Sequence, residues 1–350
     1  MFFQHAIISL AWVIFIFLVT VFFLLFSGMV THGFTRYVLD RKRKEAKRFI
    51  SDLIVNEVME PGSQNLQLLK PYAGKVTLLK VLEHFSERFS GEEWLELRAD
   101  IAISFLLPKA RQLVNHPSWM NRNFAARCFV LAPLKYDLED LLKLLDDPEF
   151  LVRCQAARAL KNLKSPEAVY KMIEHMSDEP GYAHYYFRDM LLKMKSREVL
   201  EWIEEFGLRE TKRFTKIACL DLLSGNSFQL TTRLLDDCLA ADDEDLRYYA
   251  TKVHARNPQK NSRSVLLKQM DDPDWKIREE AAYGMQYQYS NETTERLKKA
   301  LIEDPVWKVK IGAARSLKKF GFEEMEILES IDETKSPEAK EAFQYAMNFG

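Results

Sequence analysis

The sequence predicts an all-α fold, a right-handed α-solenoid of two-helix repeats preceded by one transmembrane helix. The first observation is a set of anchor positions that return every 30 to 32 residues: Pro117, Pro148, Pro180, Glu210, Asp242, Pro273, Pro305 and Pro337. The second is that the same side-chain types return at fixed offsets after these anchors. The third is an uncharged apolar run near the N-terminus. A period of this length is typical of stacked units that each bury an apolar face against their neighbours.

The apolar run from Ala6 to Phe26 predicts the transmembrane helix. It holds 21 residues without a charge, and its polar interruptions are Ser9 and Thr20. A helix of about 20 residues crosses a hydrocarbon core about 30 Å thick. A cleaved signal peptide is the alternative, but the run is long for one, and residues 1–5 carry no Lys or Arg. We therefore expect an uncleaved anchor over residues 1–30.

A basic cluster after the apolar run predicts the orientation of this anchor. It consists of Arg36, Arg41, Lys42, Arg43, Lys44, Lys47 and Arg48. Basic residues beside a span hold that side in the cytoplasm. We therefore expect a single-pass protein of the inner cell membrane with its repeats in the cytoplasm. Attraction of the basic cluster to anionic lipid is a second interpretation, which can coexist with the first.

Residues 31–90 are expected to hold the basic helix and an irregular capping region, because Pro61-Gly62 and Pro71 interrupt its helical stretches. The end of a solenoid needs such a cap to cover its apolar face. Residues 91–350 are assigned to the repeats.

The second helix of each repeat is predicted from the offsets after its anchor. Four residues on lie Val152, Phe214, Leu246, Ile277 and Val309. Eight and nine residues on lie the small pairs Ala125-Ala126, Ala156-Ala157, Ala218-Cys219, Ala281-Ala282 and Ala313-Ala314. Twelve residues on lie Phe129, Leu160, Leu192, Leu222, Met285 and Leu317. These offsets share one helix face, and the small pairs allow a neighbouring helix to approach closely.

The first helix of each repeat is predicted from an amphipathic run before the anchor. Ser165-Pro166 combines an N-cap residue with a first-turn proline. Further candidate caps are Ser227, Ser262 and Asn291.

The anchors mark the turn between the two helices. Asp147, Asp272 and Asp304 each precede an anchor proline and can accept backbone N–H groups at the start of the second helix. A basic side chain returns five residues after the anchor: Arg122, Arg153, Arg247, Arg278 and Lys310. An Asp of one turn and an Arg of the adjacent repeat can thus form an ion-pair ladder. Tyr185, Thr215 and Ala342 replace the basic residue and can interrupt it.

The runs at residues 147–160, 272–282 and 304–317 resemble HEAT repeats of the short bacterial kind. The resemblance covers roughly residues 90–350 and implies the solenoid fold. Such repeats mostly supply binding surfaces, so it implies no particular activity.

Charge and motif content narrow the function classes. The formal net charge is −1, and removing the seven basic residues of the cluster with Asp40 and Glu45 leaves −6. A nucleic-acid binder needs a basic face, so we expect no nucleic-acid partner. The densest charged run, residues 236–245, is acidic and is interpreted as a solvated turn, with a docking site for a basic partner as the alternative.

The residue types that carry chemistry are scattered. Cys128, Cys154, Cys219 and Cys238 form no C-x-x-C pair and are expected to be free thiols, buried or half-buried, in a reducing cytosol. The seven histidines stand singly, and nucleophile-elbow, Walker and Rossmann motifs are absent from the sequence. We therefore expect no catalytic residues, no cofactor and no metal site.

An aromatic residue often follows two positions after the anchor, and a second aromatic cluster lies in the central repeat. The candidate partner-binding residues are Trp119, Phe150, Tyr182, Tyr185, Tyr186, Trp275 and Trp307. Packing under the adjacent repeat is one interpretation of this row, and an exposed binding strip is the other.

These observations favour a membrane-anchored adaptor or scaffold that binds a protein partner at the inner membrane face. From location alone, we expect an envelope or polysaccharide-synthesis membrane enzyme such as a glycosyltransferase. An enzyme similar to the HEAT-type bilin lyases and a nucleic-acid binder similar to the HEAT-type alkylpurine DNA glycosylases are the alternatives.

Overall fold

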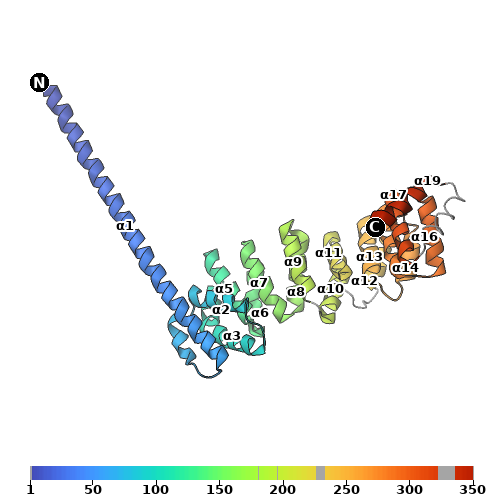
Figure 1. Ribbon diagram of the computed structural model, residues 1–350, viewed down its shortest axis with the longest axis horizontal. Coiled ribbons are helices and arrows are strands. Elements are labelled where there is room, and N and C mark those ends of the chain that lie inside the picture. Colours follow the sequence, from blue (N-terminus) through green and yellow to red (C-terminus); the bar gives the residue numbers. More distant parts are fainter. Residues whose placement is uncertain (1, 180, 195, 226–232, 322–335, 350) are drawn as a thin grey trace. The chain divides into compact units, whose positions relative to one another are not determined.

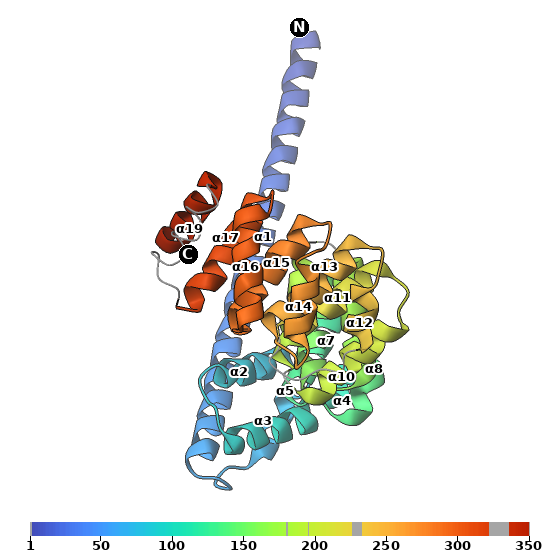
Figure 2. The same cartoon turned by 90° about the vertical axis from the view of Figure 1, so that its right-hand side faces the viewer.

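The computed structural model describes residues 2–179, 181–194, 196–225, 233–321 and 336–349, and these residues form helices and connecting turns without a strand. The all-α prediction is confirmed. The chain divides into two units, residues 1–132 and residues 133–350. Figures 1 and 2 show both units from two directions.

The first unit begins with one continuous helix, α1 (Phe2–Met59), which is 58 residues long. By length and composition, α1 is able to cross a membrane, and its apolar window is not buried. Its C-terminal end packs into the unit through the buried side chains of Ile50, Leu53 and Ile54. The helix continues through residue 30, where we placed the end of the anchor, and it carries the whole basic cluster.

The rest of the first unit consists of a 3₁₀ helix and four α-helices. They are η1 (Leu66–Tyr72), α2 (Val76–Ser86), α3 (Glu92–Phe105), α4 (Leu107–Leu113) and α5 (Trp119–Leu131). Helices α4 and α5 pack as the first two-helix repeat. Arg127 of α5 donates from Nε to Glu83 Oε1 of α2 over 2.8 Å, which ties this repeat to the preceding helix.

The second unit holds the remaining repeats. Its first helices are α6 (Leu138–Leu145), α8 (Pro166–Asp178), α10 (Arg197–Arg209), α12 (Arg233–Leu239), α14 (Ser262–Gln269) and α16 (Asn291–Glu303). Its second helices are α7 (Phe150–Leu163), α9 (Tyr182–Lys193), α11 (Arg213–Ser224), α13 (Glu244–Arg256), α15 (Trp275–Gly284), α17 (Trp307–Lys319) and α19 (Pro337–Phe349). The 3₁₀ helices η2 (Lys135–Asp137) and η3 (Met285–Tyr287) precede α6 and follow α15. Figure 1 shows α7, α9 and α11 on one side of the row and α6, α8 and α10 on the other, so this unit is an α-solenoid.

The predicted small-residue seam lies between consecutive second helices. The pairs Ala156-Ala157, Ala281-Ala282 and Ala313-Ala314 are fully buried, as are the large residues Phe129, Leu160, Leu222, Met285 and Leu317. The contact is closest at Gly284 of α15, where an added Cβ would lie 2.6 Å from the Cα of Ala255 on α13. The face predicted from the offsets is therefore the packed face.

The prediction is wrong at Phe214, which is 65% exposed, while Thr215 beside it is 2% exposed. Helix α11 begins at Arg213, three residues after its anchor, whereas α7, α13, α15 and α17 begin two residues after theirs. Each residue advances a helix by about 100°, so a start one residue later turns a different position toward the core. Leu192 is also only partly buried.

The predicted helix caps are confirmed in part. The Oγ of Ser165 accepts the backbone N–H of Ala168 over 3.1 Å. The other two described caps lie one residue earlier than predicted, since Ser290 rather than Asn291 forms a capping box with Thr293, and Asn261 precedes α14. Ser262 is instead buried, and its Oγ accepts the N–H of Gln259 over 2.6 Å. The candidate cap Ser227 and the anchor Pro180 lie outside the described residues.

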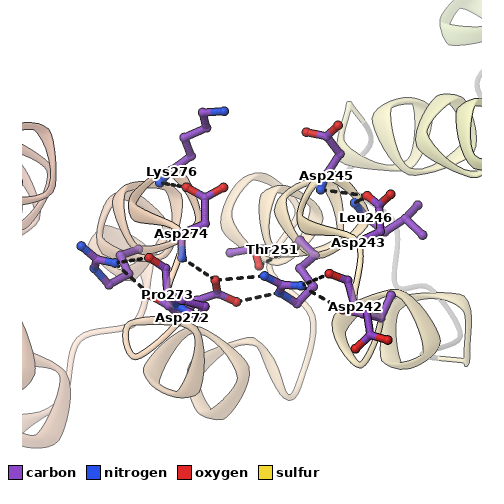
Figure 3. A network of polar contacts seen from close by, with 12 residues as sticks. Asp242, Asp243, Asp245, Leu246, Thr251, Asp272, Pro273, Asp274 and Lys276 are labelled. Atoms are coloured by element: carbon purple, nitrogen blue, oxygen red, sulfur yellow. Dashed lines mark hydrogen bonds and ion pairs between the residues drawn. The ribbon is translucent and has the colours of Figure 1, made fainter.

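The turns are joined by the predicted ion-pair ladder. Arg247 donates from Nη1 to the carbonyl of Asp242 in its own turn over 2.8 Å, and from Nε to Asp272 Oδ2 of the next turn over 2.8 Å. The other oxygen of Asp272 accepts the N–H of Asp274 over 2.9 Å, as Figure 3 shows. Arg278 and Asp304 repeat this arrangement, again over 2.8 Å. Each rung thus holds a helix start and fixes two consecutive repeats.

The ladder differs in two repeats, one in which Thr215 replaces the basic residue and one in which Lys310 stands in place of an Arg. At Thr215, the rung to the next turn comes from Arg213, which pairs with Asp243 and Asp245. Lys310 donates to the carbonyl of Ile302 over 2.9 Å and lies 3.8 Å from the carboxylate of Glu338. The replacement at Thr215 therefore moves the rung instead of removing it.

We expect Asp272→Ala to lower the free energy of unfolding by about 2 kcal/mol. The substitution leaves the guanidinium of Arg247, which is 16% exposed, without its carboxylate, and the N–H of Asp274 without its acceptor. Urea unfolding followed by circular dichroism measures this loss. The matched control is Asp242→Ala in the preceding turn, where the side chain is exposed and the change should stay within about 0.5 kcal/mol. Equal effects of the two variants would contradict the ladder.

Candidate functional site

The structure brings three of the predicted aromatic residues together. The ring of Phe150 on α7 lies 4.9 Å from that of Tyr182 and 5.8 Å from that of Tyr186, both on α9. The hydroxyl of Tyr186 donates to the carbonyl of Cys154 over 2.8 Å, and burial raises the pKa of this phenol. Tyr186 and Phe150 therefore pack between adjacent repeats, while Tyr182 and Tyr185 remain 73% and 71% exposed.

The predicted tryptophans lie apart from this cluster. Trp275 is half-buried, and Lys308 Nζ of the next repeat lies 5.0 Å from the centre of its ring. Trp307 on α17 and Trp119 in the first unit are each 39% exposed. The aromatic row thus combines packing contacts with exposed rings, and its role in partner binding stays a prediction.

We expect Trp275→Ala to lower the free energy of unfolding by about 1 kcal/mol. Half-burial of the indole and the contact with the ammonium of Lys308 both stabilise the junction between α15 and α17. Tyr182→Ala is the comparison, because its ring is mostly exposed and its loss should cost less. Unchanged urea unfolding of Trp275→Ala would contradict packing at this position and favour the binding strip.

Two hollows lie on the second helices of residues 133–350. The central hollow, about 370 Å³, is formed by α9, α11 and α13 with the end of α8, and residues that line it include Tyr185, Arg188, Phe214, Asp221 and Tyr249. The C-terminal hollow, about 410 Å³, is formed by α13, α15, α17 and α19. Adjacent residues of α13 line both, since Tyr249 lines the first and Tyr248 the second. Helix α13 therefore separates two neighbouring hollows.

A charged network fixes the central hollow. The carboxylate of Asp221 on α11 pairs with Arg188 of α9, and its Oδ1 accepts from Lys252 Nζ of α13 over 2.7 Å. Burial alone would raise the pKa of Asp221, but the hydrogen bonds from these two cations outweigh it and lower the pKa. Lys252 Nζ also lies 4.9 Å from the ring centre of Tyr249. Asp221 thus stays ionised and holds three second helices together.

The C-terminal hollow carries an excess of basic groups. Its charged lining consists of Arg256, Lys276, Lys308 and Arg315 with Glu279 and Glu280. Arg256 Nε donates to Glu280 Oε1 over 2.9 Å. Burial raises the pKa of Glu279, and the nearby cations Lys308 and Arg315 oppose this shift. The hollow is thus net basic although the solenoid sequence is acidic.

The acidic run of residues 236–245 is partly structural. Asp243 Oδ1 accepts the N–H groups of Asp245 and Leu246 over 3.0 and 3.1 Å at the start of α13. The carboxylates of Asp243 and Asp245 also form ion pairs with Arg213. These contacts account for the two carboxylates as a cap and a ladder rung.

The four thiols lie in the packed interior of the helices. Cys128, Cys154, Cys219 and Cys238 are buried free thiols, as predicted. Burial raises the pKa of Cys154 to about 11, which keeps it in the unreactive thiol form at neutral pH. Among the described residues, no group of three His, Cys, Asp or Glu side chains is placed to hold a metal ion.

Tyr185, one of the predicted aromatic residues, lines the central hollow, but the buried offsets and the aromatic row did not indicate either hollow as a whole. Residues that line the C-terminal hollow recur three, six and ten positions after the anchor, on another face of the same helix. In α15 these are Lys276, Glu279 and Tyr283, and in α17 they are Lys308, Ile311 and Arg315. A search of these offsets for polar and aromatic side chains would have singled out these residues, although not the hollow that they form with Tyr248 and Tyr345.

Comparisons with known proteins agree with this architecture. A family model of HEAT repeats matches residues 107–183, 231–318 and 263–348. No curated protein matches the sequence significantly.

Similar solved structures share little sequence with this chain. The Escherichia coli protein YibA is 15% identical, with 75% of this chain and 97% of YibA covered and a TM-score of 0.36. An engineered protein is 16% identical, with coverage of 85% and 87% and a TM-score of 0.35. Human deoxyhypusine hydroxylase is 14% identical, with coverage of 81% and 99% and a TM-score of 0.31. Since the family model covers more than half of the sequence, the chain belongs to the HEAT-repeat proteins.

Proposed function

We propose that this protein is a membrane-anchored HEAT-repeat scaffold that binds a protein partner through the second helices of its repeats. The observation that carries the proposal is the pair of hollows on α9 to α19, which present exposed aromatic and charged side chains on a fixed frame. A solenoid offers such a surface to an extended or helical segment of another protein.

The membrane part of the proposal rests on α1. Its apolar window is exposed, and apolar side chains such as Phe17, Phe23 and Leu25 are 63 to 70% exposed. Exposure of this apolar surface to water would cost a large free energy, whereas the hydrocarbon core of a bilayer would bury it. The basic cluster lies farther along the same helix, and its position supports a cytoplasmic location of the repeats at the inner membrane.

Anchoring would concentrate the repeats near partners in the same membrane, because a tethered binding site acts at a raised effective concentration. We propose an integral membrane enzyme of envelope or polysaccharide synthesis, such as a glycosyltransferase, as the partner. This choice rests on the proposed location and not on any side chain.

Crosslinking in native membranes tests the proposal. The full-length protein and a variant without residues 1–30 are expressed at equal levels, crosslinked, purified and analysed for captured proteins. We expect capture of one integral membrane protein that weakens without the anchor. Equal capture of soluble proteins alone by both forms would contradict the scaffold. A coloured adduct with a tetrapyrrole, or salt-sensitive DNA binding, would favour one of the two alternative functions.

A further inference from the structure

The C-terminal hollow differs from the rest of the solenoid in its charge. Three of its basic side chains, Lys276, Lys308 and Arg315, are exposed. Within the described residues, no ion pair joins any of the three to a carboxylate. Figure 3 shows the Lys276 side chain pointing away from Asp274, whose carboxylate accepts the backbone N–H of Lys276 over 3.0 Å. Lys308 lies over the ring of Trp275 but remains exposed, so all three cations can reach a ligand.

Tyrosines lie beside these cations. Tyr283 and Tyr345 are 38% and 44% exposed, and Tyr248 is half-buried in the wall of the hollow. Burial, and then the charge of Glu280, raise the pKa of Tyr248 to about 12, so its hydroxyl stays protonated. A protonated phenol can donate a hydrogen bond to a carboxylate or a peptide carbonyl, and its ring supplies apolar contact area.

The repeat spacing sets the geometry of the ligand. Lys276 and Lys308 each lie three residues after their anchors, on the neighbouring helices α15 and α17. Packed helices lie about 8 to 10 Å apart. An extended chain advances about 3.3 Å per residue, so three residues cover the same distance.

We propose that the C-terminal hollow binds an extended acidic peptide segment with a carboxylate at about every third residue. This inference rests on the proposed scaffold function, because it states the chemistry of the partner segment. Carboxylates fit the exposed cations by charge complementarity. Nucleic acid fits less well, because Glu279 and Glu280 interrupt the basic lining and would repel a continuous row of phosphates.

Fluorescence anisotropy with the full-length protein in nanodiscs tests this site. The probe is a labelled ten-residue peptide with Glu at every third position and Ser or Ala elsewhere. A peptide with Gln in place of each Glu is the control. We expect saturable binding of the Glu peptide that weakens as salt is raised, and at least tenfold weaker binding of the Gln peptide. Equal binding of both peptides, tighter binding of single-stranded DNA, or no binding at millimolar peptide would overturn the proposal.

Charge-reversal variants locate the site. K308E combined with R315E should weaken binding of the Glu peptide at least tenfold. The matched control is K319E on the same helix, where the side chain is exposed and does not line the hollow. The K319E variant should bind the Glu peptide with the same affinity as the unchanged protein. All these positions are exposed, and circular dichroism verifies that each variant is folded. Equal binding by the double variant and the control would overturn the assignment to this hollow.

The same variants separate this inference from the scaffold itself. If K308E with R315E still captures the membrane partner in native membranes at the full level, the scaffold stands and the acidic-peptide site is wrong. If capture fails for the unchanged protein as well, the proposed function is wrong.

Discussion

Replacing Gly284 with Leu should lower the free energy of unfolding of residues 133–350 by about 3 kcal/mol. A Cβ at this position would lie 2.6 Å from both the Cα and the Cβ of Ala255, and 3.0 Å from a methyl group of Leu266. The backbone of α13 cannot move away as a flexible side chain could, so α13 and α15 would have to separate. Overpacking of a closed core typically costs about 1 to 3 kcal/mol. Because this clash involves backbone atoms, we expect a cost at the upper end of that range.

Gly312→Ala is the graded control for this prediction. Its added Cβ would lie 3.3 Å from the carbonyl oxygen of Glu279 and 3.5 Å from the Cβ of Ala282, which requires only a small shift. Replacement of Gly by Ala within a helix also contributes about 1 kcal/mol of helix propensity, which opposes the crowding. Urea unfolding should therefore give a change near zero for Gly312→Ala. A similar effect at both glycines would contradict the close approach of α13 and α15.

Stability should fall as the pH is lowered from about 6.5 to 4, because of His254. The side chain is fully buried on α13, with Nδ1 2.9 Å from Ser262 Oγ and, among the described residues, no hydrogen-bond partner for Nε2. Burial lowers the pKa of His254 to about 4, and the charge of Asp236 opposes this shift. In the unfolded chain, the imidazole of His254 therefore binds a proton near pH 6.5. In the folded chain, the same imidazole stays neutral until about pH 4.

The sign of the effect follows from this difference in protonation. The contribution of neutral His254 is fully present above pH 6.5 and is lost progressively toward pH 4, by an amount of about 3 kcal/mol. The measurement is the free energy of unfolding against pH for the unchanged protein and for His254→Gln. The difference between the two profiles should slope in this window. Parallel profiles would show that His254 does not titrate as a buried neutral group.

The packed face of the repeats could be predicted from the sequence because it depends on local spacing. Ala281-Ala282 and Ala313-Ala314 return at the same offsets, and both pairs lie at the seam between second helices. The rung from Arg247 to Asp272 was likewise predictable, since both residues recur at fixed distances from the anchors.

The details that were missed depend on where a helix begins and on which residues from different helices meet. Phe214 is exposed because α11 begins one residue later than its anchor suggested. Ser290 and Asn291 are both common capping residues, so the sequence could not decide between them, and the capping box with Thr293 does. The rung from Arg213 to Asp243 also lies outside the regular offsets.

The hollows could not be predicted from any single repeat. The C-terminal hollow needs Tyr248, Tyr283, Lys308 and Tyr345 on four different helices, and only their packing brings these residues to one surface. The excess of basic groups in the C-terminal hollow could not be read from the composition either, because the net charge of the solenoid sequence is negative.

The most direct test of the proposed scaffold is site-specific photocrosslinking in native membranes. A photoreactive amino acid replaces Tyr283 in the C-terminal hollow or, as the control, Tyr287, which is 59% exposed and does not line that hollow. Each is placed in the full-length protein and in a form without residues 1–30. We expect one integral membrane protein to crosslink from position 283 and not from position 287, with a weaker adduct when the anchor is removed. The same adducts from both positions, or soluble proteins alone with and without the anchor, would contradict the account.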